Sequence, residues 1–250
     1  SSSSAASDVY KRQALARLRQ LSALEIGHTL GLSNNFSSSA SGRSSVMDYP
    51  HPLITDDNDD LNFDIAYDTK IGAWDKWAIK YGYGYPSANS NEKNFLQTTL
   101  ERTLEDGYEF ISDADARDPS GVHPRAHLWD NGVSASDELL RLLELRKQRM
   151  ESFNVEAIKP GVSQSMLEEV FVPLYLMHRY QIEAAIKLIG GLDFKYKVRG
   201  DNQPKHSWVD DKTQKAALDA VLLAITPEHL QIPSSVLSLI PPRSFGYGRN

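Results

Sequence analysis

Apolar residues recur at helical spacing along most of this chain, so the sequence predicts a mainly helical protein. The first predicted helix runs from about Ala14 to Leu32. Its expected buried stripe consists of Leu15, Leu18, Leu21, Ala23, Ile26 and Leu30. Further helices are expected near residues 69–82, 91–106, 134–153, 163–189 and 210–225. Pro173 should kink or split the helix that contains it, because proline cannot donate a helical hydrogen bond.

Two irregular stretches interrupt this pattern. Residues 33–68 form a long segment rich in Ser, Asn and Asp, and loops of this length are usually functional. Residues 113–133 are rich in Asp, Pro and Gly, and they mark the expected boundary between a first unit, residues 14–112, and a helical extension, residues 113–250. A short β-hairpin is expected over residues 193–209, where F-K-Y-K-V alternates and G-D-N-Q supplies turn residues.

Composition narrows the possible functions. The 250 residues are 40% hydrophobic and 24% charged, which is enough for one large domain or two small ones. A net charge of −6 and a pI near 5.6 argue against a nucleic-acid surface, and no apolar run reaches the length that spans a membrane. The absence of cysteine excludes disulfides, thiolate catalysis and cysteine-bound zinc.

The segment from Leu24 to Asn34 carries the strongest chemical signal. It reads L-E-I-G-H-T-L-G-L-S-N, which is the zinc-protease helix H-E-x-x-H-x-x-G-x-x-H with its first and third histidines replaced. Positions 24 and 28 share one helix face and could bind one ion together. Glu25 stands where a general base would deprotonate a zinc-bound water, and His28 is the remaining ligand. Gly31 should let the chain leave the helix with positive φ, so that position 34 swings back as the third ligand.

A second string lies just downstream of this motif. S-V-M-D-Y-P, residues 45–50, resembles the Met-turn of metzincin proteases, in which a methionine packs beneath the ligand histidines without binding the ion. By that resemblance Met47 is structural, and Tyr49 reaches the metal or the developing oxyanion and stabilises the transition state. Residues 71–84, 122–132, 167–185 and 239–249 extend the likeness over roughly residues 14–250. The chain is thus similar to the EcxA-like zinc-binding domain family of bacterial zinc-dependent metalloproteases, within the metzincin clan.

This resemblance carries several expectations. It implies an α+β metzincin fold, with a zinc helix and Met-turn followed by a helical C-terminal region. The N-terminal sheet subdomain that forms the upper wall of a metzincin cleft is expected to be missing here. It also implies Zn²⁺ as cofactor, a peptide or protein as substrate, and an exported location (periplasmic, secreted or surface-anchored). Residues 1–13, S-S-S-S-A-A-S-D-V-Y-K-R-Q, are interpreted as a non-native leader.

Several other residues suggest ligands but fit simpler interpretations. The acidic residues 56–64 lack the glycine and terminal glutamate of a calcium loop, so a solvated acidic loop is expected. His51 is interpreted as a turn or surface histidine rather than a substitute zinc ligand. His123 and His127 are four apart, but the proline between them argues against a shared helix face. His178 is interpreted as a hydrogen-bonded histidine of the core or of a groove.

The altered ligand positions decide the functional interpretation. Catalytic zinc sites use three protein ligands and a water molecule, whereas Leu24 cannot ligate and Asn34 offers only a neutral amide oxygen. The chain is therefore interpreted as a metallopeptidase by descent, in this copy a pseudoenzyme without catalytic zinc. The alternatives are a non-catalytic peptide-binding pseudoprotease and a helical structural domain. The lost histidines have two explanations, a lineage under relaxed selection or base errors in the sequence.

Overall fold

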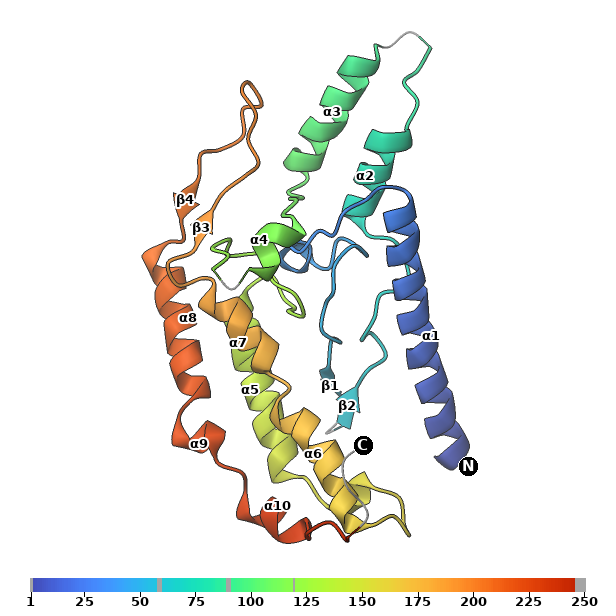
Figure 1. The fold of residues 1–250 in the computed structure, drawn as a ribbon, viewed down its shortest axis with the longest axis vertical. Coiled ribbons are helices and arrows are strands. Elements are labelled where there is room, and N and C mark those ends of the chain that lie inside the picture. The colour runs from blue at the N-terminus through green and yellow to red at the C-terminus, as the bar shows by residue number, and fades with distance from the viewer. Residues whose placement is uncertain (1, 58–59, 89–90, 119, 246–250) are drawn as a thin grey trace.

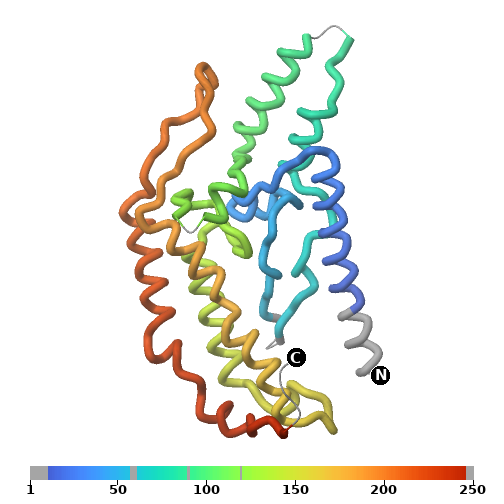
Figure 2. The backbone as a smooth tube through the Cα atoms, viewed as in Figure 1, coloured from blue at the N-terminus to red at the C-terminus, as the bar shows by residue number. Residues whose placement is uncertain are grey.

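The computed structural model describes residues 2–57, 60–88, 91–118 and 120–245, and within these ranges the protein is mainly helical. Figures 1 and 2 show a long first helix along one side, a protruding helical hairpin at one end, and a bundle of helices on the other side. The described strands form only two-stranded sheets. The mainly helical class predicted from the sequence is confirmed.

The first helix, α1 (Ser2–Thr29), is longer at its start and shorter at its end than predicted. It begins well before Ala14 and stops before Leu32. The described part of the segment interpreted as a leader, residues 2–13, is helical and continuous with the rest of α1. Its non-native origin stays a prediction.

The buried face of α1 also differs from the prediction. Gln20, Leu24 and Gly27 are buried. The side chains predicted to be buried are instead half-buried or exposed, and the exposed ones are Leu15, Leu18, Ile26 and Leu30. Periodicity locates apolar positions on a helix, but tertiary contacts decide which face is covered. Here the segment around Met47 covers the face of α1 that carries Leu24 and Gly27.

A helical hairpin follows the Met-turn region. Its arms are α2 (Ala73–Tyr83) and α3 (Glu92–Glu105), which pack against each other and protrude from the molecule (Figure 1). The Asn91 side chain begins α3 by accepting a hydrogen bond from the Lys93 amide at 2.8 Å. Both helices confirm their predictions to within a few residues.

The C-terminal half of the chain forms the bundle. Its main helices are α5 (Ala135–Glu151), α6 (Leu167–Tyr175), α7 (Arg179–Ile186) and α8 (Asp211–Ala224). The contact between α5, α7 and α8 buries Leu139, Leu143, Ala185, Ala220 and Ala224. Alanine at the facing positions lets α7 and α8 approach α5 closely, and this explains why these three helices pack most extensively.

The predicted helix over residues 163–189 is split, although not at its proline. A 3₁₀ turn, η3 (Gln164–Met166), leads into α6, and α7 begins after a break at residues 176–178. Pro173 lies inside α6, before this break. The prediction of a split is therefore confirmed, and its position is corrected.

One of the β-hairpins was predicted and the other was not. Strands β3 (Leu192–Asp193) and β4 (Ser207–Trp208) pair antiparallel, as the alternation in this segment indicated. Strands β1 (Thr55–Asp57) and β2 (Asp60–Asn62) also pair antiparallel, within the stretch expected to be an acidic loop. Their connection, residues 58–59, lies outside the described residues.

The remaining described elements are short: α4 (Asp113–Arg117), α9 (Pro227–Leu230), α10 (Ser234–Leu239), η1 (Ser39–Ser41) and η2 (Val155–Ala157). Among the helices that the structure describes, none combines the length and apolar character needed to cross a membrane.

Candidate metal centre

Helix α1 ends in a left-handed turn centred on Gly31. The Leu32 amide donates to the Gly27 carbonyl at 3.0 Å, and the Gly31 amide donates to the carbonyl three residues before it at 2.9 Å. This pair of bonds is a Schellman motif, and the φ of Gly31 is +83°, so the predicted positive φ is confirmed. The chain then turns back, and the Asn35 amide donates to the Met47 carbonyl at 2.8 Å. Position 34 is thereby held beside the Met-turn.

Met47 packs directly on α1 at Gly27. A Cβ atom built on Gly27 would lie 2.3 Å from the Met47 sulfur, so glycine lets the methionine approach the helix backbone closely at this point. Met47 is fully buried and forms a core cluster with Leu24 and Val46. Positions 24, 27 and 28 are neighbours on a helix. The methionine therefore lies against the face that carries the first two ligand positions, and Gly27 is a contributor that the sequence analysis missed.

Asp75 in α2 fastens the chain just before Met47. Its buried carboxylate accepts hydrogen bonds from the Ser45 hydroxyl at 2.6 Å and from the Val46 amide at 2.9 Å. The Ser45 oxygen in turn accepts from the Met47 amide at 2.9 Å. The same carboxylate accepts from the Gly72 amide at 2.6 Å, which is half of a helix capping box. That capping pattern, an acidic residue three positions after a helix start, is the signal that could have identified Asp75.

Gly72 brings α2 against the backbone of the Met-turn segment. The Trp74 amide donates to the Ser44 carbonyl at 3.0 Å. A Cβ atom on Gly72 would lie 1.8 Å from that same carbonyl oxygen. No side chain fits in this space without moving one of the two backbones.

Two buried carboxylates, Asp48 and Asp130, adjoin the turn. The Ser38 hydroxyl donates to Asp48 at 2.7 Å, and the Ser39 hydroxyl donates to Asp130 at 2.9 Å. Burial raises the pKa of Asp48 to about 7. Burial and the nearby charge of Asp48 raise the pKa of Asp130 well above its ordinary value. The pair therefore holds a proton at neutral pH, because two like charges cannot share a buried site at low cost.

His28 keeps the orientation of a metal ligand. Its Nδ1 lies 2.9 Å from the Leu32 carbonyl oxygen, which can only accept, so Nδ1 carries the proton and Nε2 keeps its lone pair. Histidine ligands are commonly oriented in this way by a partner on the other ring nitrogen. His28 and Glu25 are both exposed near the end of α1.

Leu24 and Asn34 do not complete a zinc site. Leu24 is 2% exposed and offers only carbon, packed against Met47. The Asn34 Oδ1 atom is buried and has no hydrogen-bond partner among the described residues, so it is available, but a neutral amide oxygen is a poor ligand for zinc. One imidazole and one amide oxygen fall short of the three protein ligands of a catalytic site. The residues present therefore do not fit a catalytic zinc ion.

Tyr49 is fixed by the segment that precedes the bundle. Its half-buried ring stacks on Phe36 with centroids 5.8 Å apart, and the Arg117 guanidinium lies over both rings. The Tyr49 carbonyl accepts a hydrogen bond from the Trp129 amide at 2.7 Å. Trp129 has a φ of +62°, a conformation that bulky residues rarely adopt. The predicted role of Tyr49 in stabilising a transition state stays a prediction.

A separate cluster offers three potential ligand atoms. Glu109, His123 and Asp193 each place one such atom within 4.8 Å of the others, and they are the only group of this kind among the described residues. Arg125 already pairs with Glu109 at 2.8 Å and with Asp193 at 2.9 Å, and Lys195 pairs with both carboxylates. The negative charge that would attract a cation is therefore neutralised within the cluster.

The tautomer of His123 also opposes metal binding in this cluster. Its Nδ1 accepts a hydrogen bond from the Arg125 amide at 3.3 Å, so in the neutral ring the proton lies on Nε2, which faces Asp193 at 3.6 Å. Burial and the charge of Arg125 lower the pKa of His123 to about 4. A metal ion would have to displace two cations and reverse this tautomer, so the cluster is better described as a half-buried ion-pair network around a buried histidine.

The three other histidines weighed in the sequence analysis are buried or half-buried. His127 faces Glu183 at 3.3 Å, His178 is buried, and His51 is half-buried beside Tyr180. The carboxylates near His123 and His127 come from distant segments of the chain. Sequence spacing could not place them, because tertiary packing alone brings those segments together.

Comparison with known proteins agrees with the helix and turn described above. Residues 7–247 match the Met-zincin family, so this chain belongs to that family. No curated protein and no solved structure matches the chain. Family membership points to the metallopeptidase class, with zinc as its metal and proteins as its substrates.

Proposed function

We propose that this chain has the scaffold of a metzincin endopeptidase but has lost the catalytic zinc site, so that it hydrolyses no peptide bonds. The observation that carries this proposal is the chemistry of positions 24 and 34. Leu24 is buried carbon packed on Met47, and Asn34 offers only an amide oxygen. His28 alone is one ligand where three are needed. Without the ion, Glu25 has no acidified water to deprotonate.

The narrower family assignment belongs to the same proposal. The resemblance of the Met-turn string and of four later segments supports a place among the EcxA-like bacterial metalloproteases. That place would make a peptide or protein the natural ligand. It would also predict that this protein is exported.

A non-catalytic peptide-binding role is the second candidate. The packing of Met47 on Gly27 and the bonds to Asp75 keep the Met-turn scaffold intact although the ligand positions have changed. Strands β1 and β2 form a two-stranded sheet, and no other described strand covers their outer edges, where an extended peptide could pair. Peptide binding that survives addition of a chelator would support this role.

Zinc titration of the unaltered chain and of repaired variants tests the first proposal. The unaltered chain should show no tight zinc binding. Leu24→His should give partial binding, because two histidines four apart on a helix form a clamp. Leu24→His combined with Asn34→His should give sub-micromolar binding, since three imidazoles and a water make a tetrahedral site. Calorimetry and competition with a chromogenic chelator measure each affinity.

Two controls make the titration specific. Leu18→His places one histidine on an exposed part of α1 away from the motif and should add no tight site. His123→Ala removes the histidine of the separate cluster and should leave the titration of the repaired variant unchanged. Sub-micromolar zinc binding by the unaltered chain that disappears in His28→Ala would contradict the proposal. In the repaired variant, Glu25→Gln should keep the metal and lose any restored proteolysis.

A further inference from the structure

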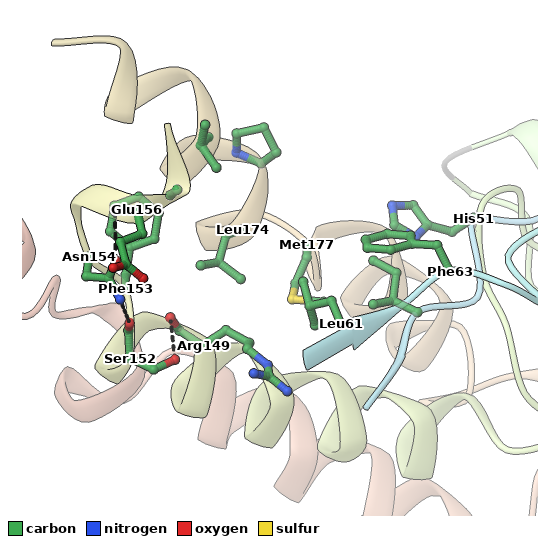
Figure 3. A pocket seen from close by; sticks show the side chains of 14 residues that line it. His51, Leu61, Phe63, Arg149, Ser152, Phe153, Asn154, Glu156, Leu174 and Met177 are labelled. Atoms are coloured by element: carbon green, nitrogen blue, oxygen red, sulfur yellow. Dashed lines mark hydrogen bonds between the residues drawn. The ribbon is translucent and has the colours of Figure 1, made fainter. Parts of the chain in front are cut away.

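A cavity of about 550 Å³ lies between the β1–β2 hairpin, the end of α5, η2 and α6 (Figure 3). This volume is in the range of about 300–1,000 Å³ that is typical of sites for small molecules. Its walls are predominantly apolar, and the apolar side chains are Ile54, Leu61, Phe63, Phe153, Ala157, Val170, Pro173, Leu174 and Met177. The cavity is separate from the helix and turn of the candidate metal centre, because none of the motif residues lines it.

Polar contacts hold the walls of this cavity in place. The Arg149 guanidinium on α5 pairs with Asp56 on β1. About two turns earlier on the same helix, Arg141 donates to the Ile54 carbonyl at 2.9 Å. The hairpin is thus attached to α5 at two points beside the cavity. We infer from these attachments that the cavity is formed before any ligand enters.

The charges around the cavity exclude a charged ligand. Arg149 is the only positively charged lining residue among those described, and Asp56 already neutralises it. Glu156 is exposed at the rim, where water solvates its charge. A charged group placed between the apolar walls would lose its hydration without gaining a partner of opposite charge. The chemistry of the lining therefore fits an uncharged molecule.

One polar atom stays available at the end of the cavity nearest the Met-turn. The His51 Nδ1 atom lies 3.2 Å from the Pro52 carbonyl oxygen, which can only accept, so Nδ1 is the protonated nitrogen. In the neutral ring, Nε2 is then an acceptor, and no described residue donates a hydrogen bond to it. By contrast, the polar side chains at the opposite end are used locally, since Asn154 caps η2 and Ser152 donates to the Gln148 carbonyl.

We propose that this cavity binds an uncharged apolar molecule with a single hydrogen-bond donor, such as a long-chain alcohol or an alkylphenol. The apolar body lies against Leu174, Met177 and Leu61, which line the middle of the cavity in Figure 3. The donor of the ligand bonds to the His51 Nε2 atom. This site is independent of whether the chain binds zinc.

Displacement of a neutral fluorescent probe tests the proposal. N-phenylnaphthylamine becomes brighter in apolar sites, and it should bind the intact chain saturably with one site. Decanol should displace it. Decyl methyl ether, which lacks the donor, should compete about threefold to tenfold less well, the loss expected for one hydrogen bond. Decanoate should compete at least about tenfold less well than decanol, because its charge finds no partner.

Variants locate the site. Val170→Trp fills the cavity from the partly exposed face of α6 and should weaken probe binding at least about tenfold. Val133→Trp adds the same ring at an exposed position outside the cavity and should leave binding within about twofold. His51→Phe should keep probe binding and abolish the preference for decanol over the ether. Circular dichroism checks that each variant is folded.

Four results would overturn the proposal. The first is the absence of saturable probe binding by the intact chain. The second is equal binding by the Val170→Trp and Val133→Trp variants. The third is displacement by decanoate as effective as displacement by decanol. The fourth is sedimentation showing a dimer of the intact chain that Val170→Trp dissociates, because a second copy would then occupy the cavity.

Discussion

The Met-turn and the α5–α7–α8 bundle are both buried, but different kinds of contact hold them. The bundle relies on apolar side chains of suitable size, such as Leu139, Leu143 and the alanines of α7 and α8. The Met-turn relies on individual atoms: the Asp75 carboxylate and the missing side chains of Gly27 and Gly72. Many apolar sequences satisfy the first arrangement, whereas single-atom changes should break the second.

Within the candidate metal centre, the residues that support the helix and the residues at the ligand positions also differ. Gly27 keeps its close contact with Met47, and His28 keeps its hydrogen bond to the Leu32 carbonyl. Leu24, on the same face, offers no ligand atom and belongs to the core around Met47. Under the proposal that the zinc site is lost, a leucine at this position exchanges a possible ligand for apolar burial.

The largest effect is expected from Gly72→Ala. The new Cβ atom would lie 1.8 Å from the Ser44 carbonyl oxygen, and neither backbone can move without breaking bonds to Asp75. The free energy of unfolding should fall by about 3 kcal/mol or more. Urea denaturation measures it, with Gly82→Ala as the control, because nothing lies within 4 Å of a Cβ atom there. The control should gain up to about 1 kcal/mol from helix propensity.

Replacing Asp75 compares the two regions directly. Asp75→Ala leaves the Ser45 hydroxyl and two amides without their charged acceptor, and it should reduce the free energy of unfolding by about 3 kcal/mol. Asp75→Asn keeps one acceptor oxygen and should lose less. Leu143→Met conserves volume in the bundle and should lose less than about 1.5 kcal/mol. A smaller loss for Asp75→Ala than for Leu143→Met would show that the turn does not depend on single atoms.

The sequence predicted the helices better than the contacts of the Met-turn, because apolar spacing is local whereas single-atom contacts depend on distant segments. Helices α5 and α8 of the bundle, like α2 and α3 of the hairpin, follow from apolar spacing and caps, both of which are local properties of the chain. The β1–β2 hairpin was missed because its acidic residues resemble a loop until Arg149 on α5 pairs with Asp56. The buried face of α1 was wrong because exposure depends on segments distant in sequence.

The candidate site was predicted in part. Motif spacing selected Glu25, His28 and Gly31. The positive φ of Gly31 is confirmed, and the roles of Glu25 as base and His28 as ligand stay predictions. The capping pattern could have indicated Asp75 as a helix cap, but the contacts of Asp75 and Gly27 with residues 45–47 lie too far along the chain for spacing rules to connect. Local motifs reveal ligand positions, whereas the contacts that hold those positions emerge only from the fold.

The two regions should also respond to pH with opposite signs. Burial and the charge of Arg146 lower the pKa of His178 in the bundle to about 4. Below its unfolded pKa of about 6.5 the unfolded chain binds the proton more readily, so stability is lost as pH falls from about 6.5 to about 4. Burial raises the pKa of Asp48 at the turn to about 7. Here the folded chain binds the proton more readily, so stability is lost as pH rises from about 4 to about 7.

Variants separate these two opposing contributions. His178→Gln should remove up to about 2 kcal/mol of the stability that the unaltered chain loses in acid. Asp48→Asn should remove the loss of stability that Asp48 causes in the unaltered chain as pH rises from about 4 to about 8. Urea midpoints across this pH range measure both. Parallel pH profiles for the unaltered chain and the His178→Gln variant would contradict the lowered pKa of that histidine.

The smallest effect is expected from Gly27→Ala, and its sign should depend on Met47. The added Cβ atom would meet the Met47 sulfur at 2.3 Å, and this buried side chain would have to shift. Overpacking of about 1–3 kcal/mol opposes a helix-propensity gain of about 1 kcal/mol, so a net loss of about 1 kcal/mol is expected. In a Met47→Ala background the sulfur is absent, and Gly27→Ala should become stabilising by up to about 1 kcal/mol. This double-mutant cycle isolates the contact between helix and Met-turn. If Gly27→Ala had the same effect in both backgrounds, Met47 would not pack on α1 at this glycine, and the turn would have no fixed place under the helix.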